Sequence, residues 1–279
     1  MYDERNHHTP QAKGVPMSMT DSTFAAVFED LSEFAKRTGD LKSDRVVLAF
    51  ERLILSGRIP EGTRLPSEEE VCTVLGVSRS VVRDSMRTLA ARGLLSVRQG
   101  IGTEVAAPSD AAFTGALLLL LSRSGLSMSE LMNARAALET SLVALATESG
   151  TEEDWAELES IYADFADAVE QQDEIRSADT HAAFHNGILK AIHQPALSLI
   201  LKPLTAITVV SGTATVRLSA PGAWDVHGHR PILDALKARD SDAAVRAMAM
   251  HFDVSRRPQA FKEYLRRDVS ETYLDHSEH

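Results

Sequence analysis

Hydrophobic residues recur at intervals of three and four along most of the chain, which is the spacing of amphipathic helices. After Pro108 this pattern continues almost to the last residues, and glycine, proline and aspartate mark its breaks. In the stretch 206–216, β-branched residues compete with the helical pattern, so a strand is the alternative there. The pattern predicts helices near 110–124, 127–149, 152–171, 173–193, 196–212, 223–239 and 241–267. We therefore predict an all-α antiparallel bundle of about seven helices over residues 108–270.

The segment 41–107 shows a different order of elements. An amphipathic helix over 43–56 comes first, and a turn rich in glycine and proline follows it. Two further helices, one ending near Leu75 and one running from Ser78 through Ala91, lie on either side of a short turn. The letters LLSVRQGIGTEV then predict two short strands joined by a glycine-containing turn. This is the order of a winged helix-turn-helix, so the predicted fold class is mainly α with a small β wing.

Local sequence features support this order. Ser67 is followed three residues later by Glu70, which is the capping-box spacing that opens a helix. Gly76 stands where the turn of a helix-turn-helix needs a backbone with positive φ. Six apolar residues are spaced to bury one face of two crossing helices: Val71, Leu75, Val77, Val82, Met86 and Leu89.

The two ends of the chain are predicted to lie outside these domains. Residues 1–22 are polar and contain proline and glycine, so we expect them to be disordered. Residues 24–37 carry a helical apolar stripe and complete an N-terminal extension over 1–40. Residues 271–279 form a short tail.

The composition is that of a globular protein with 279 residues, enough for two domains with separate cores. The single cysteine, Cys72, excludes an internal disulfide and suits a reducing cytoplasm. The longest apolar run, 116–121, is far shorter than the ~20 residues that span a bilayer. The N-terminal residues also lack the apolar core of a signal peptide. We therefore predict a cytoplasmic protein that makes no membrane contact.

The net charge of -11 would argue against nucleic acid, but it is unevenly distributed. The segment 41–107 has a net charge of +2, whereas 108–279 has a net charge of -10. A mildly basic segment followed by an acidic one indicates two domains with different partners.

The second helix of the helix-turn-helix displays hydroxyl and guanidinium groups at and near its N-terminus, from Ser78, Arg79, Ser80 and Arg83. That end of a helix carries a positive dipole and free N–H groups, which favour phosphate. Arginine can also donate two hydrogen bonds to guanine in the major groove. A surface helix whose arginines are only solvated is the alternative interpretation.

Four motifs follow one another along this segment: GRIPEGTRLPSE (57–68), LGVSRSVVRD (75–84), LAARGLL (89–95) and GIGTEV (100–105). Together they cover nearly all of residues 43–105 and resemble the N-terminal domain of the GntR family of bacterial transcription regulators. The resemblance implies that the recognition helix meets the operator and that the wing approaches the minor groove. The predicted DNA-binding residues are Ser67, Ser78, Arg79, Ser80, Arg83 and Gly100.

One position departs from the family pattern. Many relatives have an arginine directly after the letters PSE and use it on DNA, whereas this chain has Glu69 there. The operator preference of relatives therefore cannot be transferred to this chain.

Four histidines lie in predicted helices of the bundle. His181 and His185 are four residues apart in HAAFH, so they share one face of a helix. His229 and His251 lie in two later helices, and a bundle can bring such side chains together around a metal ion. Neutral imidazole binds Zn, Ni, Cu, Fe and Mn to different degrees. Four separate surface histidines are the alternative.

Five motifs are spread over residues 130–255: RAALE (135–139), FHNGI (184–188), QPAL (194–197), HRPILDAL (229–236) and AMAMH (247–251). Their order and spacing resemble the FCD domain, which is the ligand-binding domain of the FadR subgroup of GntR regulators.

This resemblance implies a divalent metal ion held by one aspartate and three histidines. The histidines match His185, His229 and His251, but the place of the aspartate is taken by His181, so we predict a four-histidine centre for Zn, Ni or Mn. Neutral ligands leave the metal charge uncompensated, which strengthens its attraction for an anion. In the family this metal anchors a small carboxylate effector, and Arg135 would complete the anion site. An ordinary salt bridge within its helix is the alternative for Arg135.

These inferences predict a DNA-binding transcription regulator and not an enzyme. It would form a homodimer, bind an inverted repeat in double-stranded DNA and act as a repressor controlled by a small organic acid. The expected acids are a sugar acid, a hydroxy acid or a dicarboxylate. The alternatives are a regulator that responds to the metal itself, one that binds an acyl-CoA, and a metal-dependent hydrolase. A hydrolase needs an open coordination site and a general base, and the sequence contains no HExxH motif.

Overall fold

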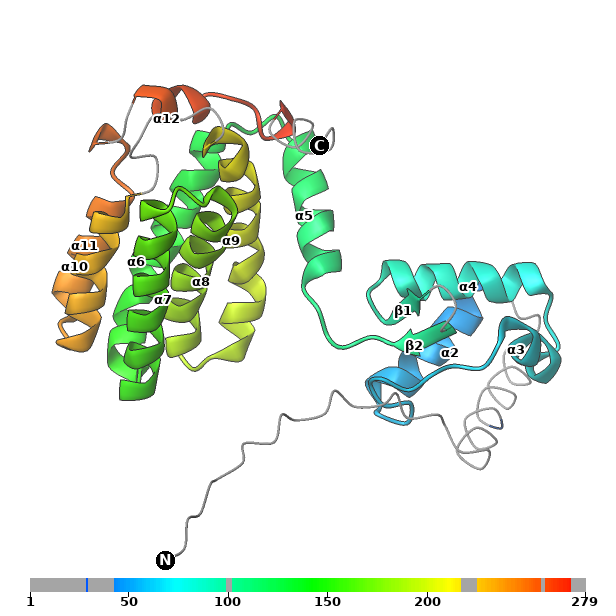
Figure 1. Ribbon diagram of the computed structural model, residues 1–279. Coiled ribbons are helices and arrows are strands. Elements are labelled where there is room, and N and C mark those ends of the chain that lie inside the picture. Colours follow the sequence, from blue (N-terminus) through cyan, green and yellow to red (C-terminus); the bar gives the residue numbers. More distant parts are fainter. Residues whose placement is uncertain (1–28, 30–42, 99–101, 217–224, 257–258, 272–279) are drawn as a thin grey trace, which may run out of the picture. The chain divides into compact units, whose positions relative to one another are not determined.

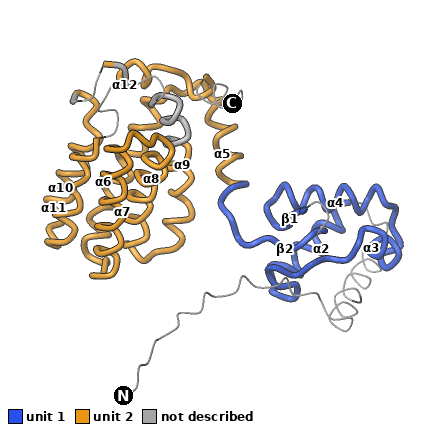
Figure 2. The backbone as a smooth tube through the Cα atoms, viewed as in Figure 1, with its two compact units in different colours: residues 1–112 blue, residues 113–279 orange. Residues whose placement is uncertain are grey.

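The structure, a computed structural model, describes residues 29, 43–98, 102–216, 225–256 and 259–271. The chain divides into two compact units, Met1–Ala112 and Phe113–His279 (Figure 2). The predicted helix over 24–37, except for Glu29, falls outside the described residues, as do the predicted disorder of 1–22 and the tail beyond Glu271.

The first unit is a winged helix-turn-helix, as predicted (Figure 1). Its two strands are antiparallel, and their register runs from Leu95 opposite Val105 to Arg98 opposite Gly102. The chain segment that leads into the helix Glu68–Leu75 also pairs with the wing, because Leu65 N–H donates to the Thr103 carbonyl at 2.8 Å. The elements are α2 (Ser43–Leu55), α3 (Glu68–Leu75), α4 (Arg79–Ala91), β1 (Leu95–Arg98) and β2 (Gly102–Val105).

The predicted turn and cap of this unit are both present. Gly76 ends α3 with φ of 65°, a left-handed conformation that glycine adopts without steric cost. Ser67 and Glu70 form the complete capping box that begins α3. Five of the six apolar residues expected to bury the crossing are buried, and the sixth, Val77, packs against them while half-buried. The hydrophobic pattern was therefore sufficient to identify this core.

The regular elements of the second unit within its described residues are helices joined by turns, and the β-branched stretch 206–216 is part of one of them (Figure 1). Helix α7 packs against α8 and α10, and α6 packs against α8 and α11. No helix within the described ranges is long and apolar enough to cross a membrane. The helices are α5 (Ala111–Arg123), α6 (Met128–Ser149), α7 (Glu152–Glu170), α8 (Glu174–Ala191), α9 (Pro195–Val216), α10 (Val226–Lys237), α11 (Ser241–His251) and α12 (Gln259–Tyr264).

The single helix predicted over 241–267 is wrong. Helix α11 ends at His251, and a short 3-10 turn over Val254–Arg256 separates it from α12. The physical reason lies in Asp253, whose carboxylate accepts a hydrogen bond from Ser255 N–H at 2.9 Å. Such a side chain offers the backbone an alternative to the helical hydrogen bond, so the helix stops there.

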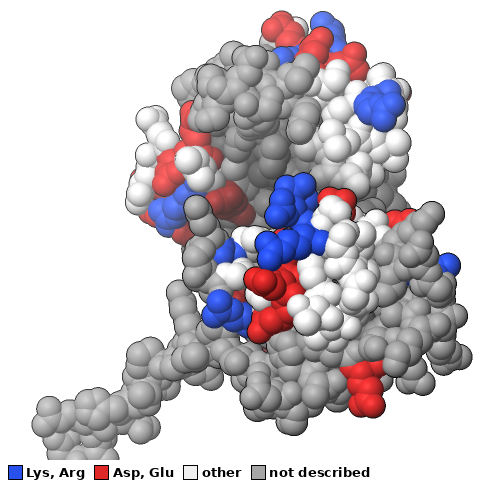
Figure 3. Space-filling model, turned by 90° about the vertical axis from the view of Figure 1, so that its right-hand side faces the viewer, with Lys and Arg blue, Asp and Glu red and all other residues white. Residues whose placement is uncertain are grey.

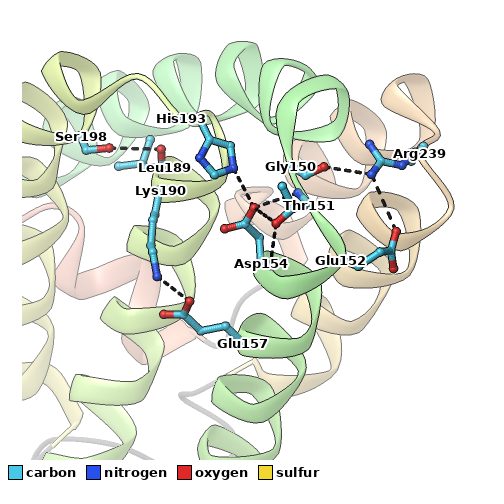
Figure 4. A network of polar contacts seen from close by, with 10 residues as sticks. All are labelled: Gly150, Thr151, Glu152, Asp154, Glu157, Leu189, Lys190, His193, Ser198 and Arg239. Atoms are coloured by element: carbon cyan, nitrogen blue, oxygen red, sulfur yellow. Dashed lines mark hydrogen bonds and ion pairs between the residues drawn. The ribbon is translucent and has the colours of Figure 1, made fainter.

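Polar contacts tie together one end of the bundle (Figure 4). The Asp154 carboxylate caps α7 by accepting from Thr151 N–H at 2.8 Å, and it also bonds His193 Nε2 at 2.8 Å, just after α8. Arg239, which follows α10, donates to the Gly150 carbonyl at 2.9 Å. These contacts fix the ends of α7, α8 and α10 relative to one another, and α8 and α10 carry three of the four predicted metal ligands.

Candidate metal centre and DNA-binding surface

The structure brings the four predicted histidines together inside the second unit. Each offers one ring nitrogen, and these four nitrogens all lie within 4.8 Å of one another. His181 and His185 come from α8, His229 from α10 and His251 from α11. The last three are buried, with exposed fractions of 0, 0 and 4%. Four separate surface histidines, the alternative interpretation, are therefore ruled out.

The donor set fits a divalent ion of the first transition series. Two nitrogens bound to one ion at about 2.1 Å lie at most ~4.2 Å apart. The separations between the ring nitrogens, which reach at most 4.8 Å, therefore have to shorten by roughly half an ångström when an ion binds. Burial of its ring and the neighbouring histidines lower the pKa of His181 well below its ordinary value, so this ring is neutral, as a ligand must be.

Two of the rings are oriented by hydrogen bonds from the nitrogen that faces away from a metal. His185 Nδ1 bonds the Glu139 carboxylate, and His229 Nδ1 donates to the Asp225 carbonyl at 2.7 Å. A proton held on Nδ1 leaves the lone pair on Nε2, so both rings are fixed in the tautomer that binds metal through Nε2.

Glu139 is the functional residue that sequence reasoning missed. It lies on α6, 6% exposed, between Arg135 and His185. Burial by itself raises the pKa of Glu139, but its ion pair with Arg135 and its contact with His185 outweigh burial and lower the pKa to about 2. Its position four residues after Arg135 in RAALE was the available signal.

The salt bridge considered for Arg135 is present, and it is buried next to the histidines. Arg135 Nε donates to Glu139 at 2.5 Å, and the guanidinium lies 5.5 Å from the centre of the Phe252 ring. The two opposite charges cancel, so this pair adds no net charge to the centre. A role of Arg135 in holding an anion remains a prediction.

Aromatic rings enclose the histidines. The centroid of Phe165 lies 5.2 Å from that of His229, Phe184 lies 5.1 Å from the same ring, and Phe252 lies 5.0 Å from His251. All three contacts are edge-on, which is a favourable geometry for aromatic pairs. Apart from the Arg135–Glu139 pair, these rings give the histidines apolar neighbours, and charges in such surroundings interact more strongly than in water.

The predicted DNA-binding residues lie at the beginning of α3 and α4. Ser67 caps α3, and Ser78 caps α4 and bonds Ser80 Oγ at 2.9 Å. Arg79 and Arg83 are exposed, with side chains 70 and 55% accessible. Gly100 falls outside the described residues. Basic and acidic side chains adjoin one another on the face shown in Figure 3.

A winged helix-turn-helix followed by a helical unit with an internal histidine cluster is the architecture of a ligand-responsive transcription regulator. The sequence matches the family described as bacterial regulatory proteins, gntR family, over residues 42–105, and the FCD domain over residues 130–254. The chain belongs to the GntR family and carries a C-terminal FCD domain. The similar proteins described next are named as transcriptional regulators.

Three similar proteins illustrate the relationship. The Glc operon transcriptional activator of Escherichia coli K12 is 33% identical over 174 residues, which cover 61% of this chain and 68% of that protein. The galactonate operon transcriptional repressor of the same strain is 26% identical over 214 residues, 74% of this chain and 91% of that protein. A solved structure of Streptococcus agalactiae GntR is 26% identical with a TM-score of 0.55, and the match covers 75% of this chain and 96% of that one.

Proposed function

We propose that this regulator binds a small carboxylate at a divalent metal ion held by His181, His185, His229 and His251, and that binding changes its affinity for an operator. The observation that carries the proposal is the convergence of four ring nitrogens from three helices within 4.8 Å. The ion, when bound, supplies positive charge and open coordination positions for oxygen ligands. The histidines hold it, and the phenylalanine rings exclude water.

The number of coordination positions decides which ions can serve this function. Four histidines fill a tetrahedral site, so an ion with that geometry has no position left for an effector. A six-coordinate ion such as Ni²⁺ or Mn²⁺ keeps two positions, which a carboxylate and a neighbouring hydroxyl can occupy together. A sugar acid or hydroxy acid has this pair of groups. One relative is named for the galactonate operon, which also points to a sugar acid.

A second candidate function also follows from the number of coordination positions. If the ion is tetrahedral zinc, the centre is closed, and the metal itself is the signal. Operator affinity would then follow the metal concentration with no organic acid present. The two candidates are therefore distinguished by which metal is bound and by whether an acid changes DNA binding.

A segment of chain connects the histidine centre with the beginning of the bundle. After His251 the chain passes through α12 and returns to the residues that precede and begin α6. There Met128 N–H donates to the Arg267 carbonyl at 2.9 Å, and Val269 N–H donates to the Leu126 carbonyl at 2.9 Å. Helix α5 precedes this point and follows the chain that leaves the wing. This arrangement supports a route by which the centre influences the DNA-binding unit.

The proposal includes a homodimer, since an inverted repeat requires two recognition helices related by twofold symmetry. Helix α5 is apolar all round: part of it packs on the core that contains Met128, while other large side chains remain exposed. A second copy of the chain is the occupant that we propose for this surface and for a similar patch on α9. Among the side chains that the structure describes on the two helices, the large apolar ones that are at least half exposed are Phe113, Leu119, Leu120, Leu199 and Ile200.

The mode of regulation that we propose is repression released by the acid. One similar protein is named as a repressor and another as an activator, so a reporter gene under the operator has to distinguish the two. Reporter output that rises with the acid supports repression, and output that needs both the protein and the acid supports activation.

The first test is elemental analysis of untagged protein purified without chelator. We expect about one metal ion per chain, lost in His181→Ala and retained in His227→Ala. His227 is a suitable control because it lies on α10 but is exposed and outside the cluster. Titration of the metal-loaded protein with galactonate and other hydroxy acids should then show binding that His181→Ala abolishes. Absence of metal from the wild-type protein, even after incubation with Zn²⁺, Ni²⁺ or Mn²⁺, would refute the proposal.

A further inference from the structure

Two ion pairs join the first turn of α3 to the beginning of α4. Glu69 Oε1 lies 3.1 Å from Arg79 Nη2, and Glu68 Oε2 lies 3.6 Å from Arg83 Nε. The third acid of this turn, Glu70, is accounted for by the capping box with Ser67. Glu68 and Glu69 have no such role in the helix cap, and their carboxylates face the arginines that are predicted to bind DNA.

These pairs contribute little to folding, because their side chains are exposed. Glu69 is 76% and Arg79 70% accessible, and an ion pair so open to water is largely screened. Their effect falls instead on DNA binding. Arg79 has to leave Glu69 to meet a phosphate, or else bring a carboxylate close to the negatively charged backbone.

A carboxylate can form favourable contacts with the edges of some bases, whereas phosphates repel it. In the major groove, cytosine presents an N4 amino group that donates to glutamate, while guanine presents the O6 and N7 acceptors that suit arginine. A neighbouring Glu69 and Arg79 can therefore both be satisfied by adjacent bases. On the phosphate backbone only the arginine can be satisfied, and the carboxylate is repelled.

We propose that Glu69 is a specificity-determining residue, which weakens binding to non-specific DNA by competing for Arg79 and favours operators that place a cytosine within its reach. This extends the DNA-binding function of the family to a position where the sequence departs from its relatives. It depends on the first unit alone and not on the proposed metal centre.

The test is the substitution Glu69→Gln, which keeps the shape and removes the charge. Full-length wild type and variant each select sites from a pool of random duplexes, and each then binds one selected duplex and one random duplex at several salt concentrations. Glu61→Gln is the matched control, because it removes the same charge from an exposed position of the same unit outside α3 and α4.

We expect Glu69→Gln to bind the random duplex several-fold more tightly than wild type or Glu61→Gln. The slope of log affinity against log salt should steepen by about 0.9, the value for one further phosphate contact. The selected sites should lose a cytosine preference at one position of each half-site and move towards adenine, which glutamine reads through N6 and N7.

Unchanged base preference together with random-duplex affinity equal to that of Glu61→Gln would overturn the proposal. A wild-type chain that enriches no sequence would overturn operator recognition itself, and this outcome is recognisable before the variants are compared. Restoration of wild-type selectivity by Glu69→Asp would support the requirement for a carboxylate.

Discussion

Replacing Glu139 by glutamine tests the electrostatics of the histidine centre, because the change removes one buried negative charge and keeps the shape of the side chain. In the variant, Arg135 loses its charged partner while it remains 2% exposed. Removal of one partner from a buried ion pair costs ~3–5 kcal/mol of stability. The pKa of Glu139, lowered to about 2 in spite of burial, shows that the ionised form is favoured beside Arg135. We therefore expect the free energy of unfolding to fall by about 3 kcal/mol.

The same substitution should also weaken metal binding, through His185. The carboxylate of Glu139 fixes the His185 ring and raises the basicity of its metal-facing nitrogen, and an amide oxygen does this less well. Loss of such an outer contact lowers metal affinity ~10–100-fold. Because the glutamine oxygen can still accept from Nδ1, we expect a loss near the lower limit, about tenfold.

The chain offers a convenient probe for this experiment. Trp155 is buried in the bundle and residues 1–112 contain no tryptophan, so tryptophan fluorescence reports on the second unit and not on the DNA-binding unit. Urea unfolding of the metal-free proteins gives the stability, and competition with a chromophoric chelator gives the metal affinity. The double variant Arg135→Gln/Glu139→Gln is the control for the isolated charge. It should recover most of the lost stability, since neither buried charge remains.

A stability loss below about 1 kcal/mol in Glu139→Gln would refute the buried ion pair, because pairs of that strength are typical of exposed surfaces. Unchanged metal affinity beside the expected loss of stability would refute the role of Glu139 in orienting His185.

Three further predictions concern the recognition helix, the packing of the bundle and the metal. Arg79→Ala should weaken operator binding by ~1–3 kcal/mol in a mobility-shift titration, with unchanged bundle stability. Gly150→Ala should destabilise the bundle by ~1–3 kcal/mol in urea, because a Cβ there would lie 2.2 Å from the Trp155 ring; Gly115→Ala, with nothing within 4 Å, should be neutral or stabilising by up to ~1 kcal/mol. Chelation of the metal should lower the melting temperature, which tryptophan fluorescence can follow. The corresponding loss of stability is ~2.7 kcal/mol if the ion was present at a hundred times its dissociation constant.

The fold and the helical positions of the four histidines could be predicted because both depend on short-range patterns, whereas their convergence into one cluster was expected from the resemblance to the FCD domain. The spacing of His181 and His185 fixes their common face once the helix is recognised, and capping residues such as Ser67 mark helix ends within three positions. The predicted helix over 196–212 is present but continues to Val216, past the break expected at Gly212, so the β-branched residues do not end it.

The features that escaped prediction depend on contacts between elements. Glu139 and His185 are 46 positions apart and meet only because α6 packs against α8. The pair of Glu69 and Arg79 depends on the angle at which α3 and α4 cross. The end of α11 was missed for a different reason. An aspartate at position 253 is compatible with the helical pattern of polar and apolar residues, and the hydrogen bond by which its side chain competes with the helix is seen only in the folded backbone.

The net charge of the histidine centre follows from the sequence and the structure together. The resemblance to the FCD domain implies that the neutral His181 takes the place of an aspartate ligand, and the structure adds the carboxylate of Glu139 but cancels it with Arg135. A divalent ion held there would keep its full charge, whereas an aspartate would neutralise half of it. A monocarboxylate then leaves one positive charge in an apolar site, which is unfavourable. A ligand with a second negative group, such as a dicarboxylate or a hydroxy acid whose hydroxyl loses its proton to solvent on binding the ion, would complete the neutralisation. The exchange of aspartate for histidine should therefore shift effector preference towards dianionic acids.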